Sequence, residues 1–266
     1  MVKEYYRPAG IGEALELLAV SGTVAIAGGT AVLAFEAKDK PERIVDVGKL
    51  LPKAILRRGD ELIIGACATF QEVVEFGQMP AVIAAAAHSM ANRNTRNRAT
   101  VGGNIAANKS CSSLAPIFLV LGATVEYQER GKPAVSSALV QWLEAPRGLL
   151  LNVRVKLEKG ARVASLRASR TACDIATATA ACAYRVDGGK IRDLRIAVGG
   201  FAAHAQLRPD IARLFEGKAL PSKAAIDEAV DPLLKAIADQ RGSADYKRLR
   251  GAALVADALH AAEEML

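Results

Sequence analysis

Hydrophobic and polar positions change in short blocks along the chain, and these blocks predict many small helices and strands. Apolar residues at Ile11, Ala14, Leu15 and Leu18 recur with the period of a helix, which we expect over residues 13–20. Short apolar runs bounded by Gly, Pro and polar residues are typical of buried strands. The first half of the chain has such runs at residues 24–27, 43–47, 54–57, 62–66, 124–127 and 149–157, with a shorter one at Val135. Between them we expect helices at residues 31–37, 70–76, 81–90, 114–121 and 137–144.

The pattern changes after residue 157. Three strands are predicted at residues 162–167, 175–186 and 191–198, with a hairpin turn at Asp187-Gly188-Gly189-Lys190. From Pro209 onward the chain is predicted to be helical, over residues 210–215, 221–239 and 245–266. In the last helix, one apolar face is predicted from Tyr246, Leu249, Ala253, Ala256, Leu259 and Ala262. We therefore predict an α+β fold with one domain at 1–157, divided into subdomains at about 1–53 and 54–157, and a second domain at 158–266.

A polar stretch at residues 95–108 interrupts this apolar pattern. It is rich in Arg and Asn and contains the pair Gly102-Gly103. Glycines let the backbone approach another molecule closely, and successive N–H groups in such turns can bind an anion. A polar loop inside a small domain needs partners for its backbone groups. We therefore expect this loop to bind the phosphates of a cofactor.

A second glycine pair, Gly28-Gly29, follows the apolar run at 24–27 and precedes a predicted helix. A strand, two glycines and a helix start can also form a phosphate site. Alone, a glycine pair after a strand is more often only a tight turn. It matches neither the G-x-G-x-x-G fingerprint nor a Walker loop, which disfavours a Rossmann domain or a nucleotide hydrolase.

Composition and charge narrow the function further. The net charge is +7, but the basic residues are scattered without interleaved aromatics, which disfavours nucleic-acid binding. The four cysteines form no C-x-x-C pair, so we expect small buried side chains and no metal site. No run approaches the ~20 apolar residues of a membrane span, and the N-terminus has no apolar signal core, so we expect a cytoplasmic protein.

Taken together, the two glycine pairs and their flanks resemble the FAD-binding subunit of the molybdenum hydroxylases, the family of xanthine dehydrogenase and carbon monoxide dehydrogenase. The matching stretches are A-G-G-T-A at 27–31, I-V-D-V at 44–47, I-G-A-C-A-T at 64–69, R-N-R-A-T-V-G-G-N-I-A at 96–106, Pro116 with L-G-A at 121–123, R-A-S-R-T-A-C-D-I-A at 167–176 and D-Y-K at 245–247. The resemblance covers nearly the whole chain, and residues 96–106 are its most specific part.

The resemblance implies a bipartite FAD-binding domain of the vanillyl-alcohol-oxidase (PCMH) type, followed by a C-terminal domain with a three-stranded antiparallel sheet and helices. It implies that both glycine pairs bind the FAD pyrophosphate. The cofactor-binding residues it predicts are Ala27, Gly28, Gly29, Thr30, Ala31, Thr100, Val101, Gly102, Gly103, Asn104, Ser113, Leu150 and Arg167. Because the flavin supplies the chemistry, no catalytic side chain and no metal ligand is expected of this chain.

The resemblance also implies partners. Such a subunit takes electrons from a [2Fe–2S] iron–sulfur subunit, which takes them from a molybdopterin-binding subunit. It passes them through FAD to NAD⁺, a quinone or another acceptor, and a homodimer of heterotrimers is one assembly this allows. In this family the molybdenum subunit selects the substrate, so the sequence of this chain does not predict which substrate the complex uses.

Two departures from the family pattern leave an alternative open. Ser113 stands where the family has an Asp that binds FAD hydroxyls, and Arg167 stands where a Lys is common. A serine hydroxyl still forms hydrogen bonds but lacks the charge of a carboxylate. The alternative is therefore a flavin-deficient structural or assembly subunit of the same fold. A free-standing flavin oxidase is less well supported, since no substrate domain or catalytic base is evident.

Overall fold

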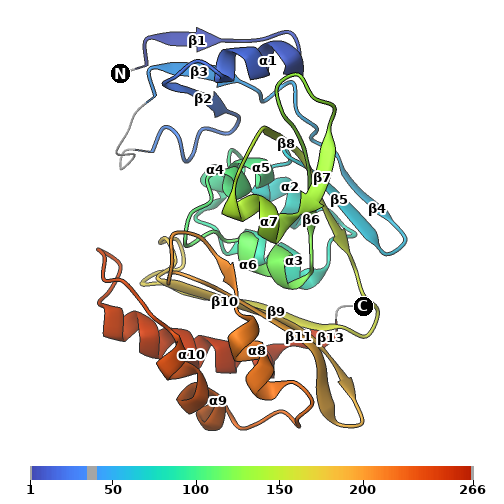
Figure 1. Ribbon diagram of the computed structural model, residues 1–266, viewed down its shortest axis with the longest axis vertical. Coiled ribbons are helices and arrows are strands. Elements are labelled where there is room, and N and C mark those ends of the chain that lie inside the picture. The colour runs from blue at the N-terminus through green and yellow to red at the C-terminus, as the bar shows by residue number, and fades with distance from the viewer. Residues whose placement is uncertain (1, 35–40, 265–266) are drawn as a thin grey trace.

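The computed structural model describes residues 2–34 and 41–264 and arranges them in three tiers (Figure 1). The first tier is a parallel sheet of order β1-β3-β2, made of β1 (Glu4–Tyr6), β3 (Arg43–Asp46) and β2 (Thr23–Ile26), with α1 (Ile11–Leu18) packed on it. Its core joins Ala14 and Leu15 of α1 to Val45. The helix predicted over 31–37 is wrong in its described part, because residues 31–33 form a turn; residues 35–37 lie outside the described residues.

The second tier is an antiparallel sheet of order β4-β5-β8-β6-β7. Its strands are β4 (Ile55–Arg58), β5 (Glu61–Gly65), β8 (Leu149–Lys156), β6 (Thr124–Gln128) and β7 (Val135–Ala138). The helices are α2 (Phe70–Glu75), α3 (Ala81–His88), α4 (Arg93–Arg96), α5 (Val101–Ala106), α6 (Ala115–Val120) and α7 (Leu139–Glu144). Thr69 begins α2 with a capping box, since Thr69 and Glu72 hydrogen bond reciprocally.

The polar stretch at 95–108 is more ordered than predicted, because it lies largely in α4 and α5. The side chain of Asn92 accepts the N–H of Thr95, and that of Thr100 accepts the N–H of Gly103. Both residues are N-caps, which favour the start of a helix by accepting an otherwise unpaired N–H. The glycine pair therefore lies in a helical turn, and the prediction of an irregular loop is wrong here.

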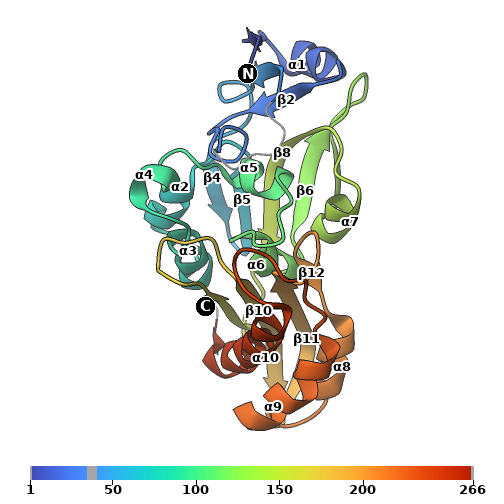
Figure 2. The same cartoon turned by 90° about the vertical axis from the view of Figure 1, so that its left-hand side faces the viewer.

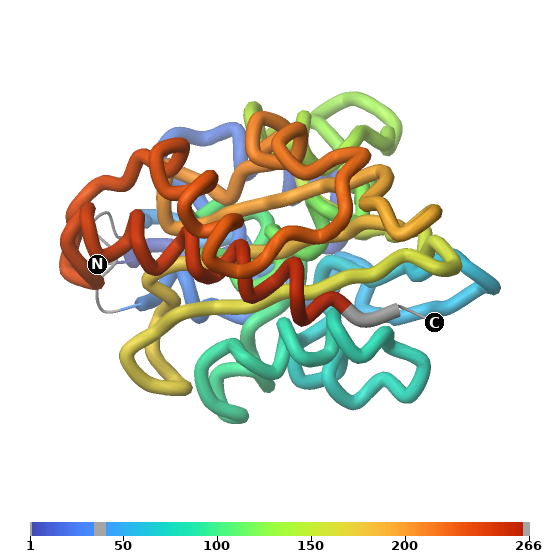
Figure 3. Tube along the Cα trace, turned by 90° about the horizontal axis from the view of Figure 1, so that it is seen from below, coloured from blue at the N-terminus to red at the C-terminus, as the bar shows by residue number. Residues whose placement is uncertain are grey.

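The third tier is a sheet of order β12-β11-β10-β9-β13. Its long strands are the three predicted ones, β9 (Arg162–Ala168), β10 (Ala178–Asp187) and β11 (Lys190–Gly199), and two-residue strands β12 (Gln206–Leu207) and β13 (Glu263–Glu264) extend it. Asp187 pairs with Lys190, which confirms the predicted hairpin. Helices α8 (Pro209–Phe215), α9 (Lys223–Val230) and α10 (Ala244–Ala261) cover its outer face, as Figures 1 and 3 show.

The inner face of this sheet packs on α3 and α6 of the second tier. Alternate residues of β10 point to opposite faces: Ala181 and Ala183 join the core of the second tier, whereas Ala180, Cys182 and Tyr184 join the core beneath α10. Burial on both faces explains why β10 is apolar at nearly every position. One continuous core therefore links the second and third tiers.

Two helical predictions in this tier are wrong in part. The helix predicted over 221–239 ends at Val230 and passes through a short 3₁₀ turn at Asp231–Leu233, where Pro232 removes a backbone donor. Of the face predicted for α10, Ala256, Leu259 and Ala262 are buried, but its first two residues are not, since Tyr246 and Leu249 are 51% and 55% exposed. The buried positions instead include Lys247 and Gly251, and Gly251 packs on the ring of Phe201.

Among the described residues, no helix combines the length and apolarity needed to cross a bilayer. The cytoplasmic location stays a prediction.

Candidate functional site

A cavity of about 460 Å³ lies where all three tiers meet. Its wall comes from the turn after β2, from the segment between α3 and α6, and from residues 173–176 with Arg167 of the C-terminal sheet. The lining is mostly small apolar side chains and backbone, with a few polar groups. A volume of roughly 300–1,000 Å³ with this character is typical of cofactor sites.

The turn after β2 depends on Gly28 for a backbone contact and on Gly29 for its conformation. A Cβ on Gly28 would lie 1.7 Å from the carbonyl oxygen of Arg98, so only glycine lets the turn touch the segment before α5. Gly29 has a φ of +78°, which glycine adopts without strain. Figure 2 shows this turn, directly after β2, next to α5. The first glycine pair is thus fixed against the second half of the site.

The backbone donors of this turn are available to a ligand. None of the hydrogen bonds recorded among the described residues uses the N–H of Gly28, Gly29, Thr30 or Ala31. All four residues line the cavity. Unpaired N–H groups beside one another, with a positive φ among them, form a concave site for an anion. The turn therefore fits a phosphate group.

The second glycine pair differs from this expectation, since its backbone donors are already used. The N–H groups of Val101 and Gly102 donate to Ala68 and Ala66 carbonyls at 2.9 and 2.8 Å. The N–H of Gly103 donates to Thr100 Oγ1 at 3.1 Å, and that of Asn104 donates to the Thr100 carbonyl at 2.9 Å. A second nest of free amides is therefore absent from residues 101–104, which the structure describes in full. This side of the cavity offers side chains instead.

Three predicted side chains on this side line the cavity: Thr100, Asn104 and Ser113. The Thr100 oxygen accepts the Gly103 N–H, so its own proton is left to donate. Ser113 is half-buried, and no hydrogen bond of its hydroxyl is recorded among the described residues. These groups can donate to phosphate or hydroxyl oxygens without a metal ion.

Arg167 lines the cavity but is largely engaged by the protein. Its guanidinium donates to the carbonyls of Ser89, Ala172 and Asp174. Burial lowers the pKa of Arg167, although Asp174 opposes the effect. The side chain therefore ties α3 to the segment 169–177, and this contact shapes one wall of the cavity.

Three predicted residues are not brought to the cavity. Val101 and Gly102 are buried beneath it, and a Cβ on Gly102 would lie 2.7 Å from that of Ala66. Leu150 is 4% exposed in β8, opposite Tyr127. Their contact with a cofactor stays a prediction, while the structure gives each a packing role. Ala27 lines the cavity beside the first glycine pair.

The cavity also has lining residues that sequence reasoning missed, among them Lys109, Cys111, Cys173 and Asp174. Cys173 and Asp174 lie inside the matched stretch 167–176, so the resemblance could have indicated that they lie near the site. The expectation of four buried cysteines holds only for Cys67 and Cys182, whose thiol pKa values burial raises to about 11 and about 12. It is wrong for Cys111, which is half-buried, and for Cys173, which is exposed.

Arg96, at the start of the matched stretch 96–106, has a structural role. The residue is 7% exposed. Its guanidinium donates to Gln71 Oε1 at 3.1 Å and to the backbone carbonyls of His88, Met90 and Ala91. These carbonyls belong to the end of α3 and the turn after it, where helical partners are missing. Arg96 therefore holds α4 against α3 and shapes the cavity from behind.

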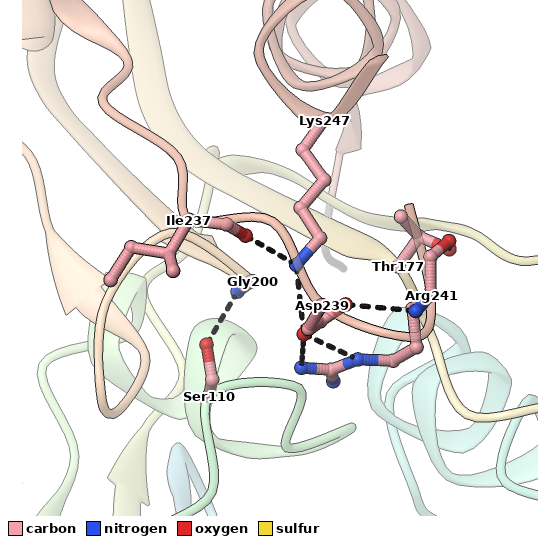
Figure 4. A network of polar contacts seen from close by, with 7 residues as sticks. All are labelled: Ser110, Thr177, Gly200, Ile237, Asp239, Arg241 and Lys247. Carbon is pink, nitrogen blue, oxygen red and sulfur yellow. Dashed lines mark hydrogen bonds and ion pairs between the residues drawn. The ribbon is translucent and has the colours of Figure 1, made fainter. Parts of the chain in front are cut away.

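An ion pair between the buried Lys247 and the partly buried Asp239 fixes the segment 234–243 beside this region (Figure 4). Lys247 is 1% exposed, and its Nζ lies 2.9 Å from the Ile237 carbonyl and 2.8 Å from Asp239 Oδ2. Asp239 also accepts from Arg241. Burial works against ionisation of Asp239, but its hydrogen bonds with Arg241 and Lys247 outweigh this and hold its pKa well below the usual range.

The same view shows how the cavity segment around Ser110 is attached to the C-terminal sheet. The N–H of Gly200 donates to both the carbonyl and the hydroxyl of Ser110 at 3.0 Å. The hydroxyl of Thr177, next to the cavity, donates a hydrogen bond to the Arg241 carbonyl at 3.4 Å. The third tier therefore holds the cavity wall through main-chain contacts.

Comparisons with known proteins agree with this arrangement. A family described as the FAD binding domain in molybdopterin dehydrogenase matches residues 1–157, and the CO dehydrogenase flavoprotein C-terminal domain matches residues 165–262. The chain is 28% identical to the carbon monoxide dehydrogenase medium chain of Hydrogenophaga pseudoflava, covering 97% of this chain and 96% of that one. It is 31% identical to the xanthine dehydrogenase FAD-binding subunit of Escherichia coli O157:H7, over 73% of each.

The fold matches a solved structure as well. The carbon monoxide dehydrogenase of Hydrogenophaga pseudoflava that lacks the Mo-pyranopterin moiety aligns with a TM-score of 0.89 at 26% identity, covering 98% of this chain and 97% of that chain.

Proposed function

The chain belongs to the family of FAD-binding domains of molybdopterin dehydrogenases, as the FAD-binding medium subunit of a molybdenum hydroxylase, and from this premise we propose where and how it uses its cofactor. FAD occupies the cavity between the turn after β2 and α5. The chain relays electrons through this FAD, from the [2Fe–2S] clusters of a partner subunit to NAD⁺, a quinone or another acceptor.

One observation carries this proposal: the turn at 28–31 lines a cavity of cofactor size, and its four backbone N–H groups have no hydrogen-bond partner within the described part of the chain. The FAD pyrophosphate is anionic, and backbone N–H groups bind such oxygens without a metal. Thr100 and Asn104 complete the site from the other side with side-chain donors. When bound, the flavin supplies the electron-transfer chemistry, while this chain binds it, orients it and shields it from water.

We assign the remaining predicted contacts to the pyrophosphate turn or to the opposite wall of the cavity. Ala27 and Ala31 flank the pyrophosphate turn, Ser113 takes a ligand hydroxyl, and Arg167 fixes the wall beside the flavin. Residues 1–157 form the FAD-binding domain, with subdomains at about 1–53 and 54–157, and residues 158–266 form the C-terminal domain. The partners are an iron–sulfur subunit and a molybdopterin subunit, and two such heterotrimers pair in the assembly.

A second candidate rests on Ser113. A serine at this position lacks the carboxylate that the family pattern has, and a hydrogen bond to a charged group contributes about 1.5–3 kcal/mol. In this second reading the site holds no flavin and the chain serves as a structural or assembly subunit. The N–H groups of 28–31, which have no partner among the described residues, favour the first candidate, because a bound anion would satisfy them.

The test is to purify the chain with its neighbouring gene products and record its visible spectrum. Oxidised-flavin bands with stoichiometric FAD, bleached when the iron–sulfur partner is reduced, are the expected result. A colourless chain that takes up no added FAD would establish the second candidate instead. A flavin that the reduced partner does not bleach would exclude the electron relay while leaving FAD binding intact.

A further inference from the structure

Asn104 is held in one orientation by groups outside the predicted motif. Its side-chain oxygen Oδ1 accepts the Ser112 hydroxyl at 2.6 Å and lies 3.4 Å from the backbone N–H of Leu114. A backbone N–H can only donate, so the Asn104 atom facing it must be the oxygen. The amide orientation is therefore fixed by chemistry as well as by placement.

The Ser112 hydroxyl can make this bond in only one sense. Its oxygen accepts the N–H of Ala115 at 3.1 Å, in the first turn of α6. That bond uses a lone pair, which leaves the single hydroxyl proton to donate to Asn104 Oδ1. Ser112 is 3% exposed, so bulk solvent competes little for either bond.

With Oδ1 engaged, the Nδ2 amide of Asn104 is the free end of the side chain. Asn104 lines the cavity, and no acceptor for Nδ2 is recorded among the described residues. The backbone N–H groups of 101–104 are already paired, so Nδ2 is one of the few donors that α5 can offer. An amide in the flipped orientation would present its oxygen, and not a donor, to an anion.

We propose that Ser112 is a positioning residue of the cofactor site: it fixes the Asn104 carboxamide so that Nδ2 donates to the pyrophosphate. This rests on the proposed function, since it names how one group of that site is held. Ser112 also lines the cavity, but its hydroxyl proton and one lone pair are already used by Asn104 and Ala115, so the proposal gives it no direct contact with the ligand. Its effect on binding passes entirely through Asn104.

A double-mutant cycle on FAD affinity tests this proposal, using Ser112→Ala, Asn104→Ala and the pair, measured by flavin fluorescence on the purified chain. Ser112→Ala is expected to weaken FAD binding about 10-fold, and Asn104→Ala about 10- to 100-fold. In the Asn104→Ala background, Ser112→Ala should add nothing, because its route to the ligand is gone. Equal losses in both backgrounds would overturn the proposal, as would a Ser112→Ala affinity equal to that of the unmodified chain.

Loss of the helix cap needs its own control, because Ser112 also accepts the Ala115 N–H. Ser222 accepts the N–H of Ala225 at 3.3 Å in the same way at the start of α9, away from the cavity lining. Ser222→Ala should lower the melting temperature to a similar extent while leaving FAD affinity unchanged. A loss of FAD affinity in this variant would mean that general destabilisation explains the Ser112 result.

Asn104→Asp gives an independent reading if Ser112→Ala fails to fold. Ser112 would still bind one carboxylate oxygen, which turns the other, charged oxygen toward the pyrophosphate. We expect weaker FAD binding than in Asn104→Ala, and equal or tighter binding would contradict the proposal. If the unmodified chain binds no FAD, the proposed function fails with it; if it binds FAD but the cycle shows no coupling, only the positioning role fails.

Discussion

Gly28→Ala is the substitution that most sharply tests how the two halves of the cavity meet. The added Cβ would lie 1.7 Å from the Arg98 carbonyl oxygen, 2.6 Å from its carbon and 3.3 Å from the Ala99 Cα. All three are backbone atoms. The Arg98 and Ala99 N–H groups both donate to the Thr95 carbonyl, and the Ala99 carbonyl accepts the Phe70 N–H at 2.9 Å, so this segment cannot yield. The turn at 28–31 must therefore move.

The size of the effect follows from that displacement. Ordinary van der Waals contact begins near 3.4 Å, so the turn has to shift by more than an ångström. Overpacking of this kind typically lowers the free energy of unfolding by about 1–3 kcal/mol. A shift of about 1 Å also moves backbone donors out of hydrogen-bond range, which we expect to weaken FAD binding by about 100-fold.

Chemical denaturation and FAD titration measure the two effects separately. Gly12→Ala is the matched control, because nothing lies within 4 Å of its Cβ position and it sits in α1. That variant should keep its FAD affinity and be as stable as the unmodified chain or slightly more so, since alanine favours helix. A Gly28→Ala chain that matches Gly12→Ala in both assays would refute the contact between the two halves of the site.

Further predictions concern the groups that hold the cavity wall. Lys247→Met should lower the free energy of unfolding by about 1–3 kcal/mol, because Asp239 keeps only Arg241 as a cationic partner and the Ile237 carbonyl loses its donor. Lys223→Met, at an exposed pair, should cost under about 1 kcal/mol; equal losses in denaturation would contradict the role of Lys247. The depressed pKa of Asp239 contributes stability above its unfolded pKa of ~3.9 that is lost as the pH falls through the folded value. Unfolding measured from pH 7 to pH 3 should therefore show a steeper loss below about pH 4 in the unmodified chain than in Asp239→Asn, and parallel curves would count against this role. Arg96→Met leaves three carbonyls at the end of α3 without their donor and should lower the free energy of unfolding by about 2–4 kcal/mol in chemical denaturation. A change below about 0.5 kcal/mol would show that water replaces the guanidinium.

Much of the fold follows from the sequence because local patterns and tertiary packing agree. The apolar runs at 54–57 and 62–66 form antiparallel neighbours, and the strands predicted around the turn at 187–190 form their hairpin. The matched stretches at 27–31 and 96–106, far apart in sequence, do meet at one cavity. Here the residue types at each position serve both the local turn and the site.

Other features depend on partners that no local pattern reveals. In the first turns of α10 Lys247 is buried, because Asp239, in a segment outside the helix, pairs with its charge. Hydrophobic periodicity cannot reveal such a partner, and it wrongly predicted that Tyr246 and Leu249 are buried. The glycines of 102–103 looked like a free anion nest, but the Ala68 and Ala66 carbonyls accept the N–H groups of Val101 and Gly102. Which donors stay free is decided by the fold and cannot be read from a glycine pair.

That difference between the two glycine pairs can be measured directly by following backbone amides in ¹⁵N-labelled protein with and without FAD. The N–H groups of Gly28, Gly29, Thr30 and Ala31 should exchange fast with solvent in the free chain, then shift and become protected when FAD binds. Those of Val101, Gly102 and Asn104 should be protected before FAD is added and change little. If instead the amides at 101–104 gain protection on binding while those at 28–31 do not respond, the account of how this chain holds its cofactor is wrong.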